Sequence, residues 1–157
     1  IVLLGAGQKN YHIALLELHK KYKEKFGLFL GFDDELAHII EAGSDMFLLP
    51  SKYEPCGLNQ MYSLVYGTVP IVRKTGGLAD TVFQFDPASL QGNGFVFDKY
   101  SVTELVKAVK NAVNLFSDKE IWNTIIKNGM KSDFSWKTST KMYLELFKTI
   151  LTKEKTL

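Results

Sequence analysis

A short loop between two apolar runs holds the residues of this chain that most clearly suggest chemistry. Residues 51–60 read Ser-Lys-Tyr-Glu-Pro-Cys-Gly-Leu-Asn-Gln. The apolar run before them, residues 46–49, predicts a strand, and the amphipathic run 61–66 predicts a helix that ends at Gly67. The loop therefore joins the carboxyl end of a strand to a helix start, where free N–H groups and the helix dipole favour a phosphate.

Glu54 does not fit a bare phosphate site, because its carboxylate would repel the anion. A carboxylate is more useful there if it accepts hydrogen bonds from hydroxyl groups attached to that anion. The loop therefore suggests a site for a sugar joined to a phosphate. The alternative is an exposed carboxylate without a partner. The loop's position favours the site, because ligands of open α/β sheets bind at the carboxyl ends of the strands.

Two further features lie close to this loop. Cys56 is the single cysteine, and a helix start raises the reactivity of a thiol. No paired base lies near it in the sequence, so we favour a small residue packed against the ligand over a nucleophile. Thr75, Gly76 and Gly77 follow the next predicted strand, residues 69–72. Two glycines permit either a tight turn or a close approach of the backbone to a sugar or phosphate.

Other kinds of site are poorly supported. Gly5-Ala6-Gly7 after the first strand suggests a dinucleotide fingerprint, but the third small residue that the fingerprint needs is Asn10 here. A nicotinamide-dependent dehydrogenase is therefore disfavoured, and the chain has no P-loop sequence. The histidines have no spacing that indicates a metal site. They are His12, His19 and His38.

The elements that must position the loop alternate along the chain. Apolar runs predict strands at residues 1–4, 28–30, 46–49, 69–72 and 95–97. Helical patterns lie between them, and three helices without intervening strands close the chain. This order predicts an α/β fold, a parallel sheet flanked by helices with right-handed crossovers. Residues 1–4 are predicted to be a buried parallel strand, so we expect a fragment of a longer protein.

The composition excludes several classes of protein. The chain has 157 residues, 46% of them hydrophobic and 23% charged, which suits one domain with a core. A net charge of +2 gives no reason to expect nucleic acid or a membrane surface as a partner. One cysteine allows no internal disulfide, and no apolar run approaches the ~20 residues of a membrane span.

Four motifs carry a resemblance that covers nearly the whole chain. Residues 52–58, 66–70, 75–82 and 133–136 resemble bacterial glycogen synthases and plant starch synthases, in the same order and spacing. That resemblance implies a Rossmann-like domain, the C-terminal half of a two-domain GT-B fold.

The resemblance also implies a domain organisation. Residues 1–134 would form a nucleotide-sugar-binding domain that is incomplete at its N-terminus, and residues 135–157 a C-terminal helix and tail. The N-terminal acceptor domain would lie outside the chain. In the last helix we expect an apolar stripe that is partly uncovered, formed by Met142, Leu146 and Ile150.

The activity that the resemblance implies is retaining transfer of glucose from ADP-glucose, or UDP-glucose, to the 4-hydroxyl end of an α-1,4-glucan. No cofactor or metal is implied. An Arg and a Lys that stabilise the leaving diphosphate would lie before Ile1. The partners would be the donor, the glucan acceptor and the missing N-terminal domain. The location would be the cytoplasm in a bacterium or the plastid in a plant or alga.

The family's site residues can be carried over to matching positions. Glu54 would be catalytic and bind hydroxyls of the donor glucose, and Phe32 would pack near the adenine. Many related glycosyltransferases carry a second Glu, eight positions after the first, that holds the ribose. This chain has Tyr62 at that position, which matches the glycogen synthases and argues against many of the other enzymes. Another GT-B glycosyltransferase and a non-catalytic nucleotide- or carbohydrate-binding module remain alternatives. We expect a shallow, half-formed donor site on one face. Its residues would be Gly31, Phe32, Glu54, Cys56, Gly57, Leu58, Asn59, Thr75, Gly76 and Gly77.

Overall fold

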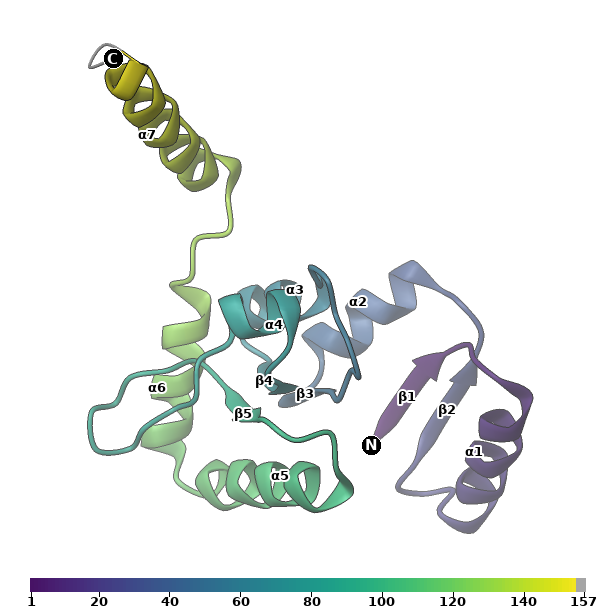
Figure 1. Cartoon of the computed structure of the whole chain (residues 1–157). Helices are drawn as coiled ribbons and strands as arrows, with labels where there is room; N and C mark the ends of the chain where they lie inside the picture. The colour runs from purple at the N-terminus through teal and green to yellow at the C-terminus, as the bar shows by residue number, and fades with distance from the viewer. Residues whose placement is uncertain (155–157) are drawn as a thin grey trace.

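The computed structural model describes residues 1–154, which form five strands and seven helices (Figure 1). The predicted alternation of strands and helices, followed by three closing helices, is confirmed. In chain order the elements are β1 (Val2–Gly5), α1 (Lys9–Lys21), β2 (Gly27–Leu30), α2 (Asp34–Ala42), β3 (Met46–Leu49), α3 (Asn59–Tyr66), β4 (Val69–Arg73), α4 (Gly76–Thr81), β5 (Phe95–Phe97), α5 (Val102–Phe116), α6 (Lys119–Met130) and α7 (Trp136–Glu154).

The strands are all parallel but form two sheets, where the sequence predicted one. The smaller sheet pairs β1 with β2, and the larger has the order β3-β4-β5. In the larger sheet Met46 pairs with Val69 and Ile71 pairs with Phe95. This register brings the carboxyl ends of the three strands to one edge. The loops after β3 and β4 therefore start side by side.

The core lies on both faces of the larger sheet. On one face Phe95 stacks on Trp122 of α6 at 6.2 Å between ring centroids, and Ala112 of α5 packs beside them. On the other face Val72 packs with Leu64 of α3, together with residues of α4. Figure 1 shows α3 and α4 above this sheet and α5 below it. Alternate residues of β4 thus enter two different clusters, as the two-residue period of a strand requires.

The smaller sheet is much less covered. Residues 1–4 were predicted to be a buried strand, and this is wrong: no residue of β1 is buried. Ile1 is 90% exposed and Val2 is 56% exposed. In the described residues β1 pairs with β2 at one edge only, so its side chains lack the neighbours that would bury them.

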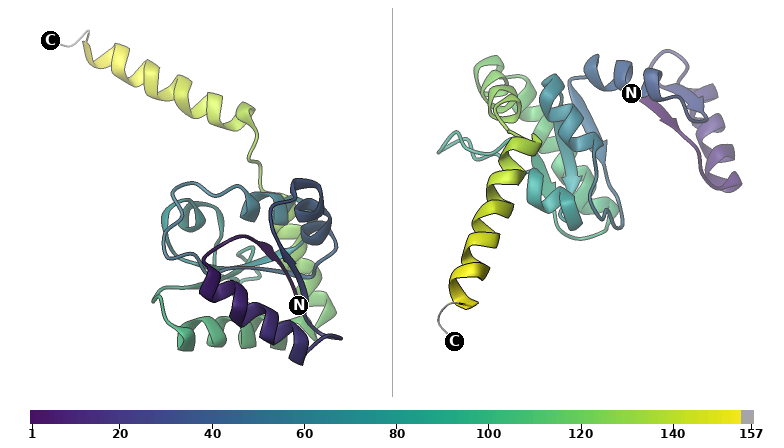
Figure 2. Two further views of the ribbon diagram at one scale, coloured as in Figure 1. Left: turned by 90° about the vertical axis from the view of Figure 1, so that its right-hand side faces the viewer. Right: turned by 90° about the horizontal axis from the view of Figure 1, so that it is seen from above.

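Helix α7 projects away from the rest of the molecule (Figures 1 and 2). Met142, Leu146 and Ile150 are 71%, 52% and 48% exposed, so the predicted uncovered stripe is confirmed. No described helix is long and apolar enough to cross a membrane.

Candidate functional site

The Glu54 loop runs from the carboxyl end of β3 to the start of α3. Leu58 is the N-cap residue of α3, and its side chain accepts no capping hydrogen bond. In the described part of the chain, the N–H groups of Leu58 and Asn59 donate to no acceptor. Two unpaired donors at the positive end of a helix are a favourable place for an anion.

The Glu54 side chain lies half-buried at the edge of this loop. Ser51 Oγ donates a hydrogen bond of 3.4 Å to Glu54 Oε2. Within residues 1–154, no cation forms an ion pair with this carboxylate. Most of its acceptor capacity is therefore free for donors from a ligand, such as sugar hydroxyls.

The two glycines at the start of α4 lie directly against the Glu54 loop. The N–H of Gly77 donates to the carbonyls of Glu54 and Pro55, at 3.2 Å each. A Cβ on Gly76 would lie 1.9 Å from the backbone carbonyl oxygen of Glu54, and one on Gly77 would lie 1.8 Å from the backbone carbonyl oxygen of Cys56. Both positions therefore require glycine, because the loop after β4 approaches the Glu54 loop too closely for a side chain. The sequence had suggested only a turn or an approach to the ligand.

Gln60 is a residue of this site that sequence reasoning missed. Its side chain is fully buried in the first turn of α3, and its Nε2 donates to the carbonyls of Cys56 and Gly57 at 3.3 and 3.0 Å. Nε2 also lies 3.2 Å from Oγ1 of Thr81 in α4. This amide holds the loop from the helix side. The sequence does hold one indication of this role, because Gln60 is a polar residue on the apolar face of a short helix.

The expected site residues fall into two groups. Those on the loops after β3 and β4 lie together: they are Glu54, Cys56, Gly57, Leu58, Asn59, Thr75, Gly76 and Gly77. Gly31 and Phe32 follow β2, which belongs to the other sheet. Phe32 is 87% exposed, and no hydrogen bond or ring contact in the described residues joins it to the Glu54 loop.

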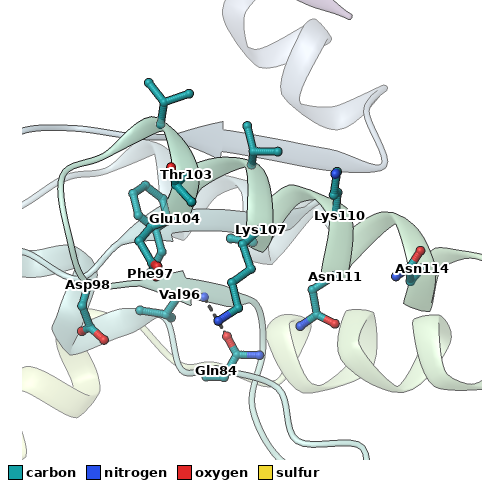
Figure 3. A pocket seen from close by; sticks show the side chains of 13 residues that line it. Gln84, Val96, Phe97, Asp98, Thr103, Glu104, Lys107, Lys110, Asn111 and Asn114 are labelled. Carbon is teal, nitrogen blue, oxygen red and sulfur yellow. Dashed lines mark hydrogen bonds between the residues drawn. The ribbon is translucent and has the colours of Figure 1, made fainter.

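A wide hollow lies elsewhere on the molecule. It has a volume of about 1130 Å³ and runs between α5 and the free edge of β5 (Figure 3). Gln84 accepts a hydrogen bond of 2.9 Å from the N–H of Val96 there, so its amide covers part of the strand edge. Lys107 and Asn111 line the same hollow. No loop residue from 51 to 59 lines it.

A metal centre has no support in the part of the chain that the structure describes. No group of three or more His, Cys, Asp or Glu side chains is arranged there to hold an ion. The groups that the candidate site presents are one carboxylate, a helix N-terminus and closely packed backbone.

Comparison with known proteins identifies the family. A sequence model of the family "Glycosyl transferases group 1" matches residues 1–131. The glycogen synthase of Koribacter versatilis is 51% identical over 146 residues, which are 93% of this chain and 30% of that protein. The glycogen synthase of Thermotoga maritima is 48% identical over 154 residues, which are 98% of this chain and 32% of that protein. The chain thus spans about a third of the length of these relatives.

Solved structures agree with this comparison. The catalytic domain of Starch Synthase IV from Arabidopsis thaliana, bound to ADP and acarbose, is similar with a TM-score of 0.83 and 37% identity. The match covers 94% of this chain and 31% of that one. Sucrose-phosphate synthase from Thermosynechococcus elongatus, at 20% identity and a TM-score of 0.66, shares the fold; its match covers 97% of this chain and 38% of that one. The predicted α/β fold of a GT-B glycosyltransferase is confirmed. By its sequence over residues 1–131, the chain belongs to the glycosyl transferases of group 1.

Proposed function

We propose that this chain supplies part of the donor site of a glycogen or starch synthase, an enzyme that transfers glucose from ADP-glucose to the 4-hydroxyl end of an α-1,4-glucan with retention. One observation carries the proposal: the Glu54 carboxylate lies on the same loop as the uncapped N-terminus of α3. About 50% identity to glycogen synthases supports this choice among the reactions of the family.

Different residues of the loop would bind different parts of the donor. The free N–H groups of Leu58 and Asn59 bind the diphosphate, whose negative charge grows as the glycosidic bond breaks. Glu54 accepts hydrogen bonds from glucose hydroxyls. Its negative charge also stabilises the positive charge that develops on the sugar ring, so it favours the transition state over the bound donor.

Other parts of the machinery would come from neighbouring segments. Phe32 packs on the adenine once the smaller sheet is held against the larger one. Residues 1–134 form the donor domain and α7 an appended helix, while the end of the predicted tail, residues 155–157, lies outside the described residues. The chain matches about a third of the length of the similar glycogen synthases, so the proposal assigns the acceptor-binding domain, and the Arg and Lys that neutralise the leaving diphosphate, to the part that is not matched.

The relatives support a choice of nucleotide and of location. The similar starch synthase structure was bound to ADP, which supports ADP-glucose over UDP-glucose. The similar glycogen synthases are bacterial, which supports the bacterial cytoplasm over the plastid.

The test is glucan extension by the full-length protein, with ADP-glucose and UDP-glucose offered separately. We expect steady extension of an α-1,4-glucan with ADP-glucose, and none from the 157-residue chain alone, because it matches only about a third of the length of the glycogen synthases. Nucleotide binding without transfer by the full-length protein would contradict the proposal and favour a binding module. Transfer to a different acceptor would favour another GT-B glycosyltransferase.

A further inference from the structure

Arg73 is the last residue of β4, and its side chain lies between the loops that follow both neighbouring strands. Its Nε donates to the carbonyl of Ser51 at 2.8 Å, and its Nη2 donates to the carbonyl of Lys52. On the other side its Nη1 donates to the carbonyl of Asp98 at 3.4 Å. The guanidinium lies 5.8 Å from the centroid of the Tyr100 ring. One planar cation thus binds three carbonyl groups from two loops.

These carbonyls need a donor from a side chain because the chain has left the sheet. β3 ends at Leu49 and α3 begins at Asn59, so no strand or helix pairs the carbonyls of Ser51 and Lys52. Hydrogen bonds from a charged donor are stronger than those between neutral groups. Across residues 1–154 the guanidinium has no carboxylate within ion-pair distance, so its charge is directed at the backbone.

Ser51 connects Arg73 to the carboxylate. Its carbonyl accepts from Arg73, while its Oγ donates to Glu54 Oε2. Further along the loop, the N–H of Gly77 donates to the carbonyls of Glu54 and Pro55. Arg73 ends β4, and Gly77 lies in the first turn of α4. These two residues therefore hold the Glu54 loop before and after the carboxylate.

We propose that Arg73 is a positioning residue, which acts through Ser51 to fix the Glu54 carboxylate against the glucose ring of the donor. The inference rests on the proposed function. A lysine at this position keeps the charge, but its compact ammonium group does not reproduce the planar fork that serves several acceptors at once. The Arg73→Lys and Arg73→Met variants should therefore behave alike.

Lys74 offers a matched control. It is the next residue along the chain, its side chain is exposed, and no hydrogen bond or ion pair joins that side chain to the loop. Lys74→Met removes one positive charge at almost the same place and leaves the three carbonyls untouched.

The first measurement is limited proteolysis of the full-length protein by trypsin. Within the described residues the loop's own N–H groups are unpaired, so hydrogen exchange there is already fast, and the loop is followed instead by the rate of tryptic cleavage after Lys52, whose carbonyl Arg73 holds. Arg73→Met and Arg73→Lys should speed this cleavage, whereas Lys74→Met should match the wild type. An unchanged cleavage rate in the Arg73 variants would overturn the inference. This result does not depend on glucose transfer by the protein.

The second measurement is a double-mutant cycle with Glu54→Gln, using kcat for glucan extension. Misplacing a reacting group by about 1 Å costs up to about 100-fold, so Arg73→Met should lower kcat about 10- to 100-fold. The Kd for ADP should stay within about threefold, because the α3 N–H groups are not held by Arg73. In the Glu54→Gln background the same substitution should cost less than about threefold.

Equal losses in the two backgrounds would overturn the inference, because Arg73 would then act independently of Glu54. Absence of glucose transfer by the wild-type protein would instead overturn the proposed function, and with it the catalytic part of this inference. The rate of tryptic cleavage after Lys52 alone would then decide whether Arg73 holds the loop.

Discussion

The two sheets of this chain are built from similar apolar strands but differ in how far they are covered. The first four residues of β4 are buried, whereas no residue of β1 is. β4 has a strand on each side and helices against both faces, and β1 has a strand on one side only. The hydrophobic pattern therefore determines that a strand forms, and its neighbours determine whether that strand is buried.

The same difference separates the parts of the candidate site. The residues contributed by the larger sheet are joined by hydrogen bonds and contacts between their loops. Phe32, at the end of the smaller sheet, is 87% exposed and has no such partner in residues 1–154. Matched substitutions in the covered and uncovered parts of the molecule test this difference.

The largest effect on stability should come from truncating a buried aromatic. Phe95→Ala in β5 should lower the free energy of unfolding by about 3–5 kcal/mol, because it removes a fully buried ring and leaves a cavity beside Trp122. Phe29→Ala in β2 should cost less than half as much, because Phe29 is 41% exposed. Urea denaturation of both variants measures the difference. Equal losses would show that the smaller sheet is as well packed as the larger.

A methyl group added between the two loops should have a smaller but clear effect. Gly77→Ala should destabilise the fold by about 1–3 kcal/mol, because the new Cβ would collide with the Cys56 carbonyl. Gly7→Ala is the control: no heavy atom lies within 4 Å of the added Cβ. Thermal unfolding of the two variants tests this contrast. A normal Tm for Gly77→Ala would mean that the loops separate easily.

Replacing Glu41 in α2 should change the free energy of unfolding by an amount that depends on pH. Its side chain is 4% exposed, and its Oε2 has no hydrogen-bond partner in the described residues. Burial raises the pKa of this carboxyl above its ordinary value of 4.5, against the opposing effect of His38. The protonated form thus favours folding below pH 4.5, and this stabilisation is lost as the pH rises through the folded-state pKa.

Glu41→Gln should therefore be more stable than the wild type at pH 7, and the difference should shrink as the pH falls through the folded-state pKa toward 4.5. Unfolding curves recorded from pH 4 to pH 8 measure it. A Glu41→Gln variant that is less stable at pH 7 would mean that the ionised carboxylate has a stabilising partner.

The smallest effect on the free energy of unfolding is expected for a substitution in α7. Leu146→Ala should change the free energy of unfolding by no more than about 0.5 kcal/mol, because the side chain is 52% exposed on a projecting helix. Ile125→Ala in α6, which is fully buried, is the matched contrast. A large loss for Leu146→Ala in this chain would mean that α7 packs against a surface.

The sequence was sufficient to predict the elements and the loop that carries Glu54, because apolar periodicity, Pro and Gly act locally. It was not sufficient to predict the division into two sheets, which depends on which strands are available to pair. Gln60 and Arg73 were missed for a related reason. Their roles arise from backbone carbonyls contributed by other segments, and a pattern of residue types does not show these.

The sequence predicted that the two glycines lie close to the Glu54 loop, but not that a side chain at these positions would collide with that loop. Strand order indicated that the loops after β3 and β4 start side by side. Only coordinates show that a Cβ at Gly76 would overlap the Glu54 carbonyl. Close approach between segments is a property of packing, so one sequence does not reveal it.

The central claim is that the Glu54 carboxylate acts on the glucose in the transition state. The most direct test is kcat for glucan extension beside the Kd for ADP, in the full-length wild type, Glu54→Gln, and the exposed control Glu35→Gln. Loss of a preorganised charge predicts a kcat about 10²- to 10³-fold lower for Glu54→Gln. We expect an unchanged Kd for ADP, and a normal kcat for Glu35→Gln. Equal losses in kcat and in ADP affinity would contradict the account, because Glu54 would then only hold the loop.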